Sequence, residues 1–150
     1  RWHAAMTRLD LDLITARLAT LQSGGTVDLV ARAATRDAAM ARGRAVETSI
    51  WVYRIAIDAE PTGLAMRQQT ETIGVLSLVR DDMQAPDTGA TAADALDAVC
   101  AAAGTLLAPV AGWRPATNCM PLQWDGGGIV TATEQAAAWE DRYLCVLSTL

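Results

Sequence analysis

The sequence predicts an α+β domain: a mainly antiparallel or mixed sheet that contains a long hairpin, with helices packed on one face. Three observations lead to this class. Residues 49–58 and 68–80 are rich in β-branched and aromatic side chains, which is typical of strands. Residues 11–22 and 91–107 repeat apolar side chains at helical spacing. These segments are grouped rather than strictly alternating, as in α+β proteins.

The first helix is predicted from a start signal, an apolar stripe and a stop signal. Thr7 is the expected N-cap, and Asp10 stands three residues later in a capping-box position. The glycines at 24–25 end the helix. A short strand over 26–32 and a short alanine-rich helix over 33–42 are expected next. The apolar stripe of the first helix consists of Leu11, Ile14, Leu18 and Leu21.

The central pair of strands forms the predicted long hairpin, with a loose loop at Pro61-Thr62-Gly63. Its strands span roughly ten to thirteen residues, against a mean of about 5–6. A small sheet does not cover strands of this length, so the surplus must project, bend or pair outside the domain. Gly74 allows a bulge or a close approach of the backbone.

A second helix follows the acidic loop 81–89. Thr91 is the expected cap, with Asp94 at the capping-box position, and Pro109 and Gly112 close the helix. Its predicted inner face consists of Leu96, Val99, Cys100, Ala103, Leu106 and Leu107.

The last third of the chain is predicted to be β structure. Strands are expected over 119–124, 129–133 and 139–148, with a hairpin turn at 125–128. No repeat, linker or change of composition divides the chain. Residues 1–150 are therefore expected to form a single domain.

Composition argues against several classes of function. The formal net charge is −5, with 12 arginines and no lysine, and this acidic balance disfavours gripping a nucleic-acid backbone. The apolar runs fall short of the ~20 residues that a membrane span needs, so no membrane association is expected. Cys100, Cys119 and Cys145 are widely spaced, and we interpret them as reduced, buried side chains.

The sequence shows no recognisable catalytic or cofactor-binding constellation. His3 is the single histidine and stands near the terminus, which disfavours Ser–His and Cys–His pairs. We interpret Asp81 and Asp82 as a solvated loop rather than a metal site. The glycines at 126–128 precede no helix or lysine and are not a phosphate loop. No catalytic residue, metal or cofactor is expected.

Four tryptophans fall in or beside the predicted strands. A buried tryptophan usually belongs to the core, and we expect this of Trp113, Trp124 and Trp139. Trp113 would lock the end of the second helix onto the sheet. Tryptophan is also a favoured interface anchor, and both interpretations stay open for Trp51 on the long hairpin.

The C-terminal third carries a specific order of short motifs. It reads Gly-Trp-Arg-Pro at 112–115, Pro-Leu-Gln-Trp-Asp-Gly-Gly at 121–127 and Ile-Val at 129–130, and it ends on an aromatic pair. This order resembles the tail terminator proteins of long-tailed bacteriophages, and the layout of the rest of the chain agrees. Trp124 departs from the family, where tyrosine is more usual. The motif residues are Gly112, Trp113, Pro115, Trp124, Gly126, Gly127, Trp139 and Tyr143.

The resemblance implies a role in assembly rather than catalysis. Tail terminators form a homohexameric ring that caps the tail tube, stops its polymerisation and offers a surface for joining the head. The implied partners are the tail tube protein and a head–tail connector or neck protein, with DNA only passing through the channel. The implied location is the tail of a virion or phage-like particle, such as a gene transfer agent or tailocin, assembled in the bacterial host cytoplasm.

A ring of one small chain needs a head-to-tail interface that closes, and the long hairpin is the natural donor. The candidate interface residues are Trp51, Tyr53, Arg54, Arg67 and Glu71. The candidate partner-facing or channel-facing loop residues are Glu60, Asp81, Asp82 and Asp87. Two alternatives stay open: another neck or head–tail joining ring component of the same particle, and a small enzyme.

Overall fold

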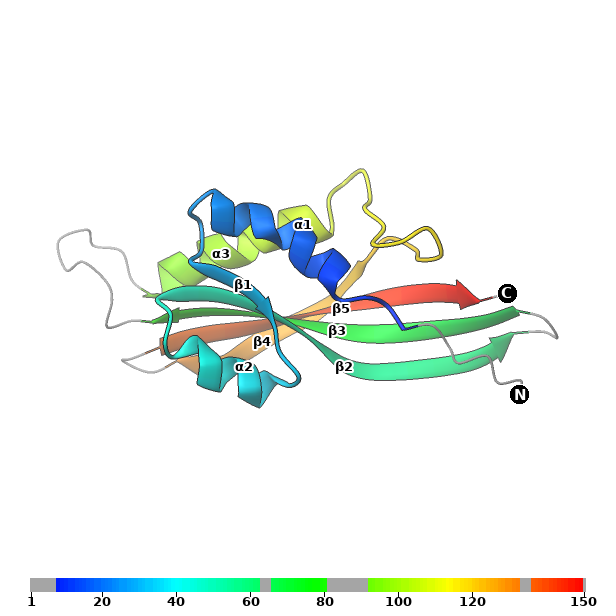
Figure 1. The fold of residues 1–150 in the computed structure, drawn as a ribbon, viewed down its shortest axis with the longest axis horizontal. Helices are drawn as coiled ribbons and strands as arrows, with labels where there is room; N and C mark the ends of the chain where they lie inside the picture. The colour runs from blue at the N-terminus through cyan, green and yellow to red at the C-terminus, as the bar shows by residue number, and fades with distance from the viewer. Residues whose placement is uncertain (1–7, 63–65, 81–91, 133–135, 150) are drawn as a thin grey trace.

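The fold is a five-stranded sheet with three helices, seen in a computed structural model that describes residues 8–62, 66–80, 92–132 and 136–149 (Figure 1). The strand order is β1-β2-β3-β5-β4, with β1 parallel to β2 and every other neighbouring pair antiparallel. The predicted α+β class and mixed sheet are confirmed. The elements are α1 (Asp12–Ser23), β1 (Leu29–Arg32), α2 (Arg36–Gly43), β2 (Thr48–Thr62), β3 (Met66–Arg80), α3 (Ala92–Leu107), β4 (Gln123–Ala132) and β5 (Ala136–Thr149).

Strands β2 and β3 form the long hairpin that the sequence predicts. Their register runs from Thr48 opposite Val79 to Thr62 opposite Met66. Pro61 and Thr62 therefore belong to β2 and not to a loop, and Gly63 lies outside the described residues. Proline is tolerated here because this part of β2 has no described strand on its other side.

The hairpin contains one irregularity, between Arg54 and Ala56. Ile55 is the extra residue of this bulge, so it does not hold a regular mid-strand position. Next to the bulge, Gly74 lies opposite Tyr53, and a Cβ atom at Gly74 would approach the Tyr53 ring to 2.3 Å. The glycine thus permits the close approach that the sequence suggested.

The three helices are divided between the two faces of the sheet. Alternate residues of β2 enter two separate cores: Ile50 and Val52 pack with α1 and α3, whereas Trp51 and Tyr53 pack with α2. Figure 1 shows α1 and α3 above the sheet and α2 below it. The expectation of helices on one face is therefore wrong for α2, because both faces of β2 carry large apolar side chains that must be covered.

Helix α1 begins five residues later than its predicted cap. Residues 8–10 are not helical, and the first helical residue, Asp12, donates its backbone N–H to the Asp10 carboxylate at 2.9 Å. The delay has a tertiary cause, because the backbone of Leu9 is bonded to side chains of the hairpin. Thr7 and Thr91, the two predicted caps, lie outside the described residues, whereas Thr35 caps α2 through Ala38.

The predicted turn at 125–128 is wrong, because this segment lies inside β4. The register between β4 and β5 shifts between Trp124 and Gly127, and Gly126 adopts a φ of 96°. The glycines thus accommodate a bulge within a strand. Of the predicted strand at 119–124, only Gln123 and Trp124 belong to a strand, β4. Cys119 forms an isolated bridge with Leu147.

The tryptophans divide differently from the prediction. Trp51 is 1% exposed and belongs to the core, with Arg42 stacked 4.7 Å from its ring centroid. Trp113 and Trp139 are half-buried. Trp124 is 60% exposed, so its expected place in the core is wrong. Its side chain lies on the α3 face beside that of Tyr143, and it is exposed because the edge strand β4 has a described neighbour on one side only.

The different burial of Trp51 and Trp124 predicts different contributions to stability. Trp51→Ala should lower the free energy of unfolding by about 3–5 kcal/mol, since a fully buried indole is lost. The matched control Trp124→Ala should cost less than about 1 kcal/mol, because that indole is mostly in solvent. Urea unfolding followed by circular dichroism measures both. Equal losses would contradict the assignment of Trp51 to the core.

Candidate assembly surfaces

Most of the hairpin side chains predicted for a subunit interface are buried inside the chain itself. Trp51, Tyr53 and Glu71 are each at most 2% exposed, so they do not form a surface that a neighbour could contact. Arg54 is one-fifth exposed. The backbone of Arg67 pairs with Pro61 and Thr149 near the hairpin end, and its side chain lies outside the description. Trp51 and Tyr53 are buried because helices cover both faces of the hairpin. The sequence did not reveal which face each helix covers.

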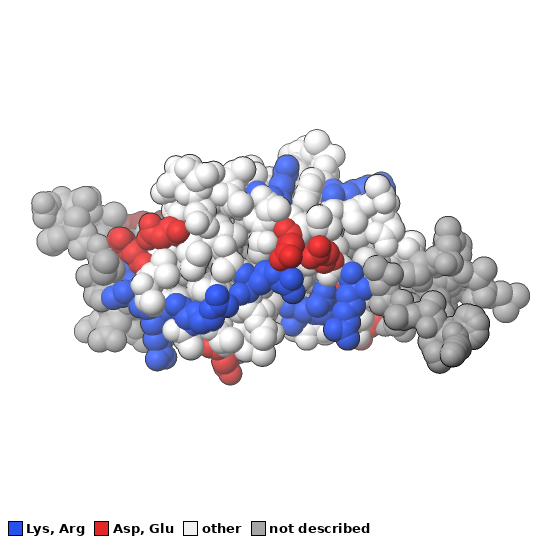
Figure 2. Space-filling view, in the orientation of Figure 1, with Lys and Arg blue, Asp and Glu red and all other residues white. Residues whose placement is uncertain are grey.

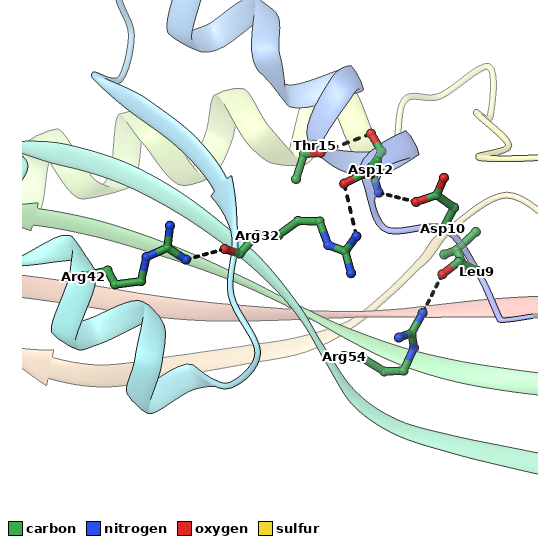
Figure 3. Close-up of polar contacts among 7 residues, drawn as sticks. All are labelled: Leu9, Asp10, Asp12, Thr15, Arg32, Arg42 and Arg54. Atoms are coloured by element: carbon green, nitrogen blue, oxygen red, sulfur yellow. Dashed lines mark hydrogen bonds and ion pairs between the residues drawn. The ribbon is translucent and has the colours of Figure 1, made fainter.

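Glu71 instead organises a buried polar group, which we call the Glu71 cluster. Its carboxylate accepts hydrogen bonds from the Arg54 side chain at 2.5 Å, the backbone N–H of Leu9 at 2.6 Å and the Gln69 amide at 3.0 Å. Arg54 also donates to the carbonyl oxygen of Leu9 (Figure 3). The cluster therefore ties the segment before α1 to both strands of the hairpin.

A second polar group joins β2 to β5 on the opposite face. The Tyr53 hydroxyl donates to Glu140 at 2.5 Å, and Arg142 donates to the other carboxylate oxygen at 3.0 Å. Arg36 of α2 lies 3.8 Å from the same carboxylate. Burial, followed by the bond to Glu140, raises the pKa of Tyr53 far above its usual range, so the phenol stays protonated and donates.

The predicted loop residues do not form one described surface. Glu60 lies within β2, opposite Gln68, rather than in a loop. Asp81, Asp82 and Asp87 lie outside the described residues.

Among the described strands, the sheet has two open edges, which lie on its opposite sides. Strand β1 covers β2 from Ser49 to Val52, and beyond this point the outer part of β2 is an edge that carries exposed isoleucines. Ile55 and Ile57 are 41% and 36% exposed there. On the other side, β4 pairs with β5 among the described strands and exposes Trp124 and Ile129. Exposed apolar edge strands are ready partners for another chain.

Beside β4 lies a pocket of about 410 Å³, which we call the tryptophan groove. Helix α3 forms one wall, β5 the floor and Trp124 the outer wall. Both indole N–H groups, from Trp124 and Trp139, donate to the same oxygen of Asp141 at 3.0 and 2.9 Å. The groove is lined by Asp97, Cys100, Ala101, Gly104, Ala108, Trp124, Trp139, Asp141 and Tyr143.

The motif residues serve this part of the fold. Gly112 has a φ of 76°, which favours glycine in the turn that leaves α3. Pro115 and Tyr143 are buried. At Gly127, a Cβ atom would lie 2.6 Å from the Trp139 indole and 2.7 Å from Asp141, so glycine is needed for the two indoles to share that carboxylate.

The opposite edge is basic. Figure 2 shows arginine side chains in a band across the face that displays β1 and α2. In Figure 3, Arg42, Arg32 and Arg54 lie in a row from α2 across β1 to β2. Sequence order gave no sign of this basic edge, because these arginines belong to three separate elements.

Within the described ranges, no group of three or more histidine, cysteine, aspartate or glutamate side chains is placed to hold a metal ion. Among the same residues, no helix has the length and apolar character needed to cross a membrane.

These features define an α+β fold whose described strands leave two sheet edges open. A family model described as phage tail terminator protein matches residues 5–148. The chain therefore belongs to the phage tail terminator family and is a structural component of a phage tail. A comparison with curated proteins finds no match.

The Glu71 cluster predicts a specific loss of stability. Glu71→Ala should lower the free energy of unfolding by about 3–5 kcal/mol, because Arg54 and the Leu9 N–H lose their buried acceptor. Asp58→Ala, an exposed carboxylate on the same hairpin, should change it by about 0.5 kcal/mol or less. Urea denaturation compares the two variants. Similar midpoints would show that Glu71 is dispensable.

The tryptophan groove predicts a slow thiol. Burial raises the pKa of Cys100 to about 11, and the neighbouring Asp141 and Asp97 carboxylates add to this rise, against a lowering by Ser77. At pH 8 about one thiol in a thousand is then ionised, against about a quarter for an ordinary cysteine. At pH 8, iodoacetamide should label Cys100 at least about 100-fold more slowly than free cysteine. The rate of labelling of Cys100 should rise about tenfold with each pH unit up to about pH 11. Peptide mass mapping measures the rate, with the urea-unfolded chain as control. Rapid labelling at pH 8 would contradict the burial.

Proposed function

We propose that this chain is the tail terminator subunit of its particle: six copies form a ring that caps the tail tube, stops its polymerisation and presents the surface to which the head joins. Its partners are then the tube protein on one side and a connector or neck protein on the other, with DNA passing through the channel. The particle is a phage or a phage-derived assembly such as a gene transfer agent or tailocin. The ring acts by geometry and not by catalysis.

The observation that carries this proposal is the family match over residues 5–148, which covers almost the whole chain. We take that span to act as one domain. The open edges support the proposal independently. A closed ring of identical copies needs two different surfaces that fit each other head to tail. This chain has two unlike edges on opposite sides of one sheet, formed by β1 with outer β2 and by β4.

A cap must also match the tube on one side without copying the surface to which tube subunits add. A rigid sheet with a projecting hairpin meets this requirement. In Figure 1 the outer parts of β2 and β3 run past the helices, with β5 beside them. Ile55 and Ile57 on this part of β2 are 41% and 36% exposed, so they are surface that the core does not use, and we assign them to contact with neighbouring proteins.

The proposal predicts both a mass and a tail phenotype. Six copies of 15.9 kDa give 95.4 kDa, which light scattering should detect for the protein alone or bound to tube protein. Deletion of the gene should leave tubes longer than normal or tails that never join heads, because nothing covers the growing end. Electron microscopy of lysates measures tail length and head attachment.

Complementation separates the function from other effects of the deletion. The wild-type gene supplied in trans should restore tail length, and the Glu71→Ala variant should restore it poorly because it folds poorly. Normal tails with attached heads in the deletion strain would refute the terminator function. A ring with another copy number would refute the hexamer.

A further inference from the structure

The basic residues of one open edge and the tryptophan groove at the other lie at the same height along the strand direction. Across the sheet, Arg32 stands opposite Val52, Val52 opposite Val75, and Val75 opposite Asp141. Gly127 completes this row on β4. A row of paired residues runs perpendicular to the strands. The last residue of β1 is therefore level with the floor of the tryptophan groove at the opposite edge.

The neighbouring row repeats the relation. Arg54 stands opposite Ile73, Ile73 opposite Tyr143, and Tyr143 opposite Trp124. Copies placed side by side in one plane would thus bring the basic edge of one copy beside the tryptophan groove of the next.

The groove has the chemistry of a receptor for a cation. Its described lining contains two carboxylates, Asp97 and Asp141, and no arginine. Trp124, 60% exposed, presents an indole at the mouth, and indole rings bind guanidinium groups through their faces. Burial is the main cause of the raised pKa of Cys100, and the nearby Asp141 and Asp97 carboxylates add to it.

Arg32 is the side chain on the basic edge that is best placed to leave its present partner. Its ion pair with Asp12, at 3.2 Å, is open to solvent, with the two side chains 46% and 68% exposed. Exposed pairs of this kind contribute little to stability. Arg54, by contrast, is one-fifth exposed and committed to the Glu71 cluster.

We propose that the tryptophan groove of each subunit receives the Arg32 side chain of the neighbouring copy, where the guanidinium stacks on Trp124 and pairs with Asp97. This contact forms the head-to-tail joint of the ring, so it rests on the proposed function. Nucleic acid is the other acidic ligand that the basic edge could bind. The complementary acidic groove favours a second copy, because it lies on the same chain, at the same level and with the opposite charge.

A charge exchange tests the pairing. Arg32→Asp and Asp97→Arg should each lower the yield of rings at least about tenfold, because each places two like charges at the joint. The double variant should recover most of the wild-type yield, since the pair is restored in reverse. Arg114→Asp, which reverses an exposed arginine outside the groove and the basic edge, should leave the yield unchanged. Native mass spectrometry and negative-stain imaging count rings, with the protein alone and with the tube protein of the same particle.

Trp124→Ala provides a variant that does not depend on charge. Because this indole is mostly exposed, the variant should fold normally by circular dichroism and still lose rings. Rings formed by Arg32→Asp, Asp97→Arg and Trp124→Ala as readily as by wild type would overturn the inference and leave the proposed function standing. Single variants that fail without rescue in the double variant would also overturn the pairing. If wild-type protein forms no ring, alone or on tubes, the proposed function itself is refuted, and the pairing falls with it. Arg32-dependent binding of a DNA duplex by an unassembled chain would point to nucleic acid instead.

Discussion

The arrangement of the domain depends on one buried carboxylate, that of Glu71. It is fully enclosed, and its hydrogen bonds come from the segment before α1, from β2 and from a neighbouring position on β3. A buried charge is tolerated only when its oxygens are satisfied, so the three donors and the acceptor require one another. The hairpin therefore cannot move relative to the start of α1 without leaving the buried Glu71 carboxylate short of hydrogen-bond donors.

Sequence patterns predicted the elements better than their surroundings. The long hairpin, the apolar face of α3 and the final strand follow from local composition, and the structure has all three. The position of α2 did not follow, because an alanine-rich helix gives no sign of the face it will cover. Ile50 to Tyr53 did show that both faces of the strand need a cover, because all four consecutive side chains are large, but not which helix covers which face.

The candidate surfaces were harder to predict for a related reason. Trp51 and Trp124 both lie in strands, and only the strand order separates the buried one from the exposed one. The glycines at 126–128 look like a turn in sequence, but they permit a bulged edge strand and the approach of two indoles to one carboxylate. The basic edge combines side chains from three elements. Properties of this kind arise from tertiary neighbours and cannot be found by reading along the chain.

The long pairing of β3, continuous with β5 and interrupted by one bulge with β2, has a mechanical consequence. β3 pairs with β5 from Arg67 to Arg80 and with β2 over nearly the same length, and the hydrogen bonds lie perpendicular to the strands. A force directed along the strands therefore loads many of these bonds at once, in shear. A force across them would open the pairs one after another from an end. The domain is accordingly strongest against axial traction along its hairpin and weakest against peeling at β1 and β4, the two strands with a single described neighbour.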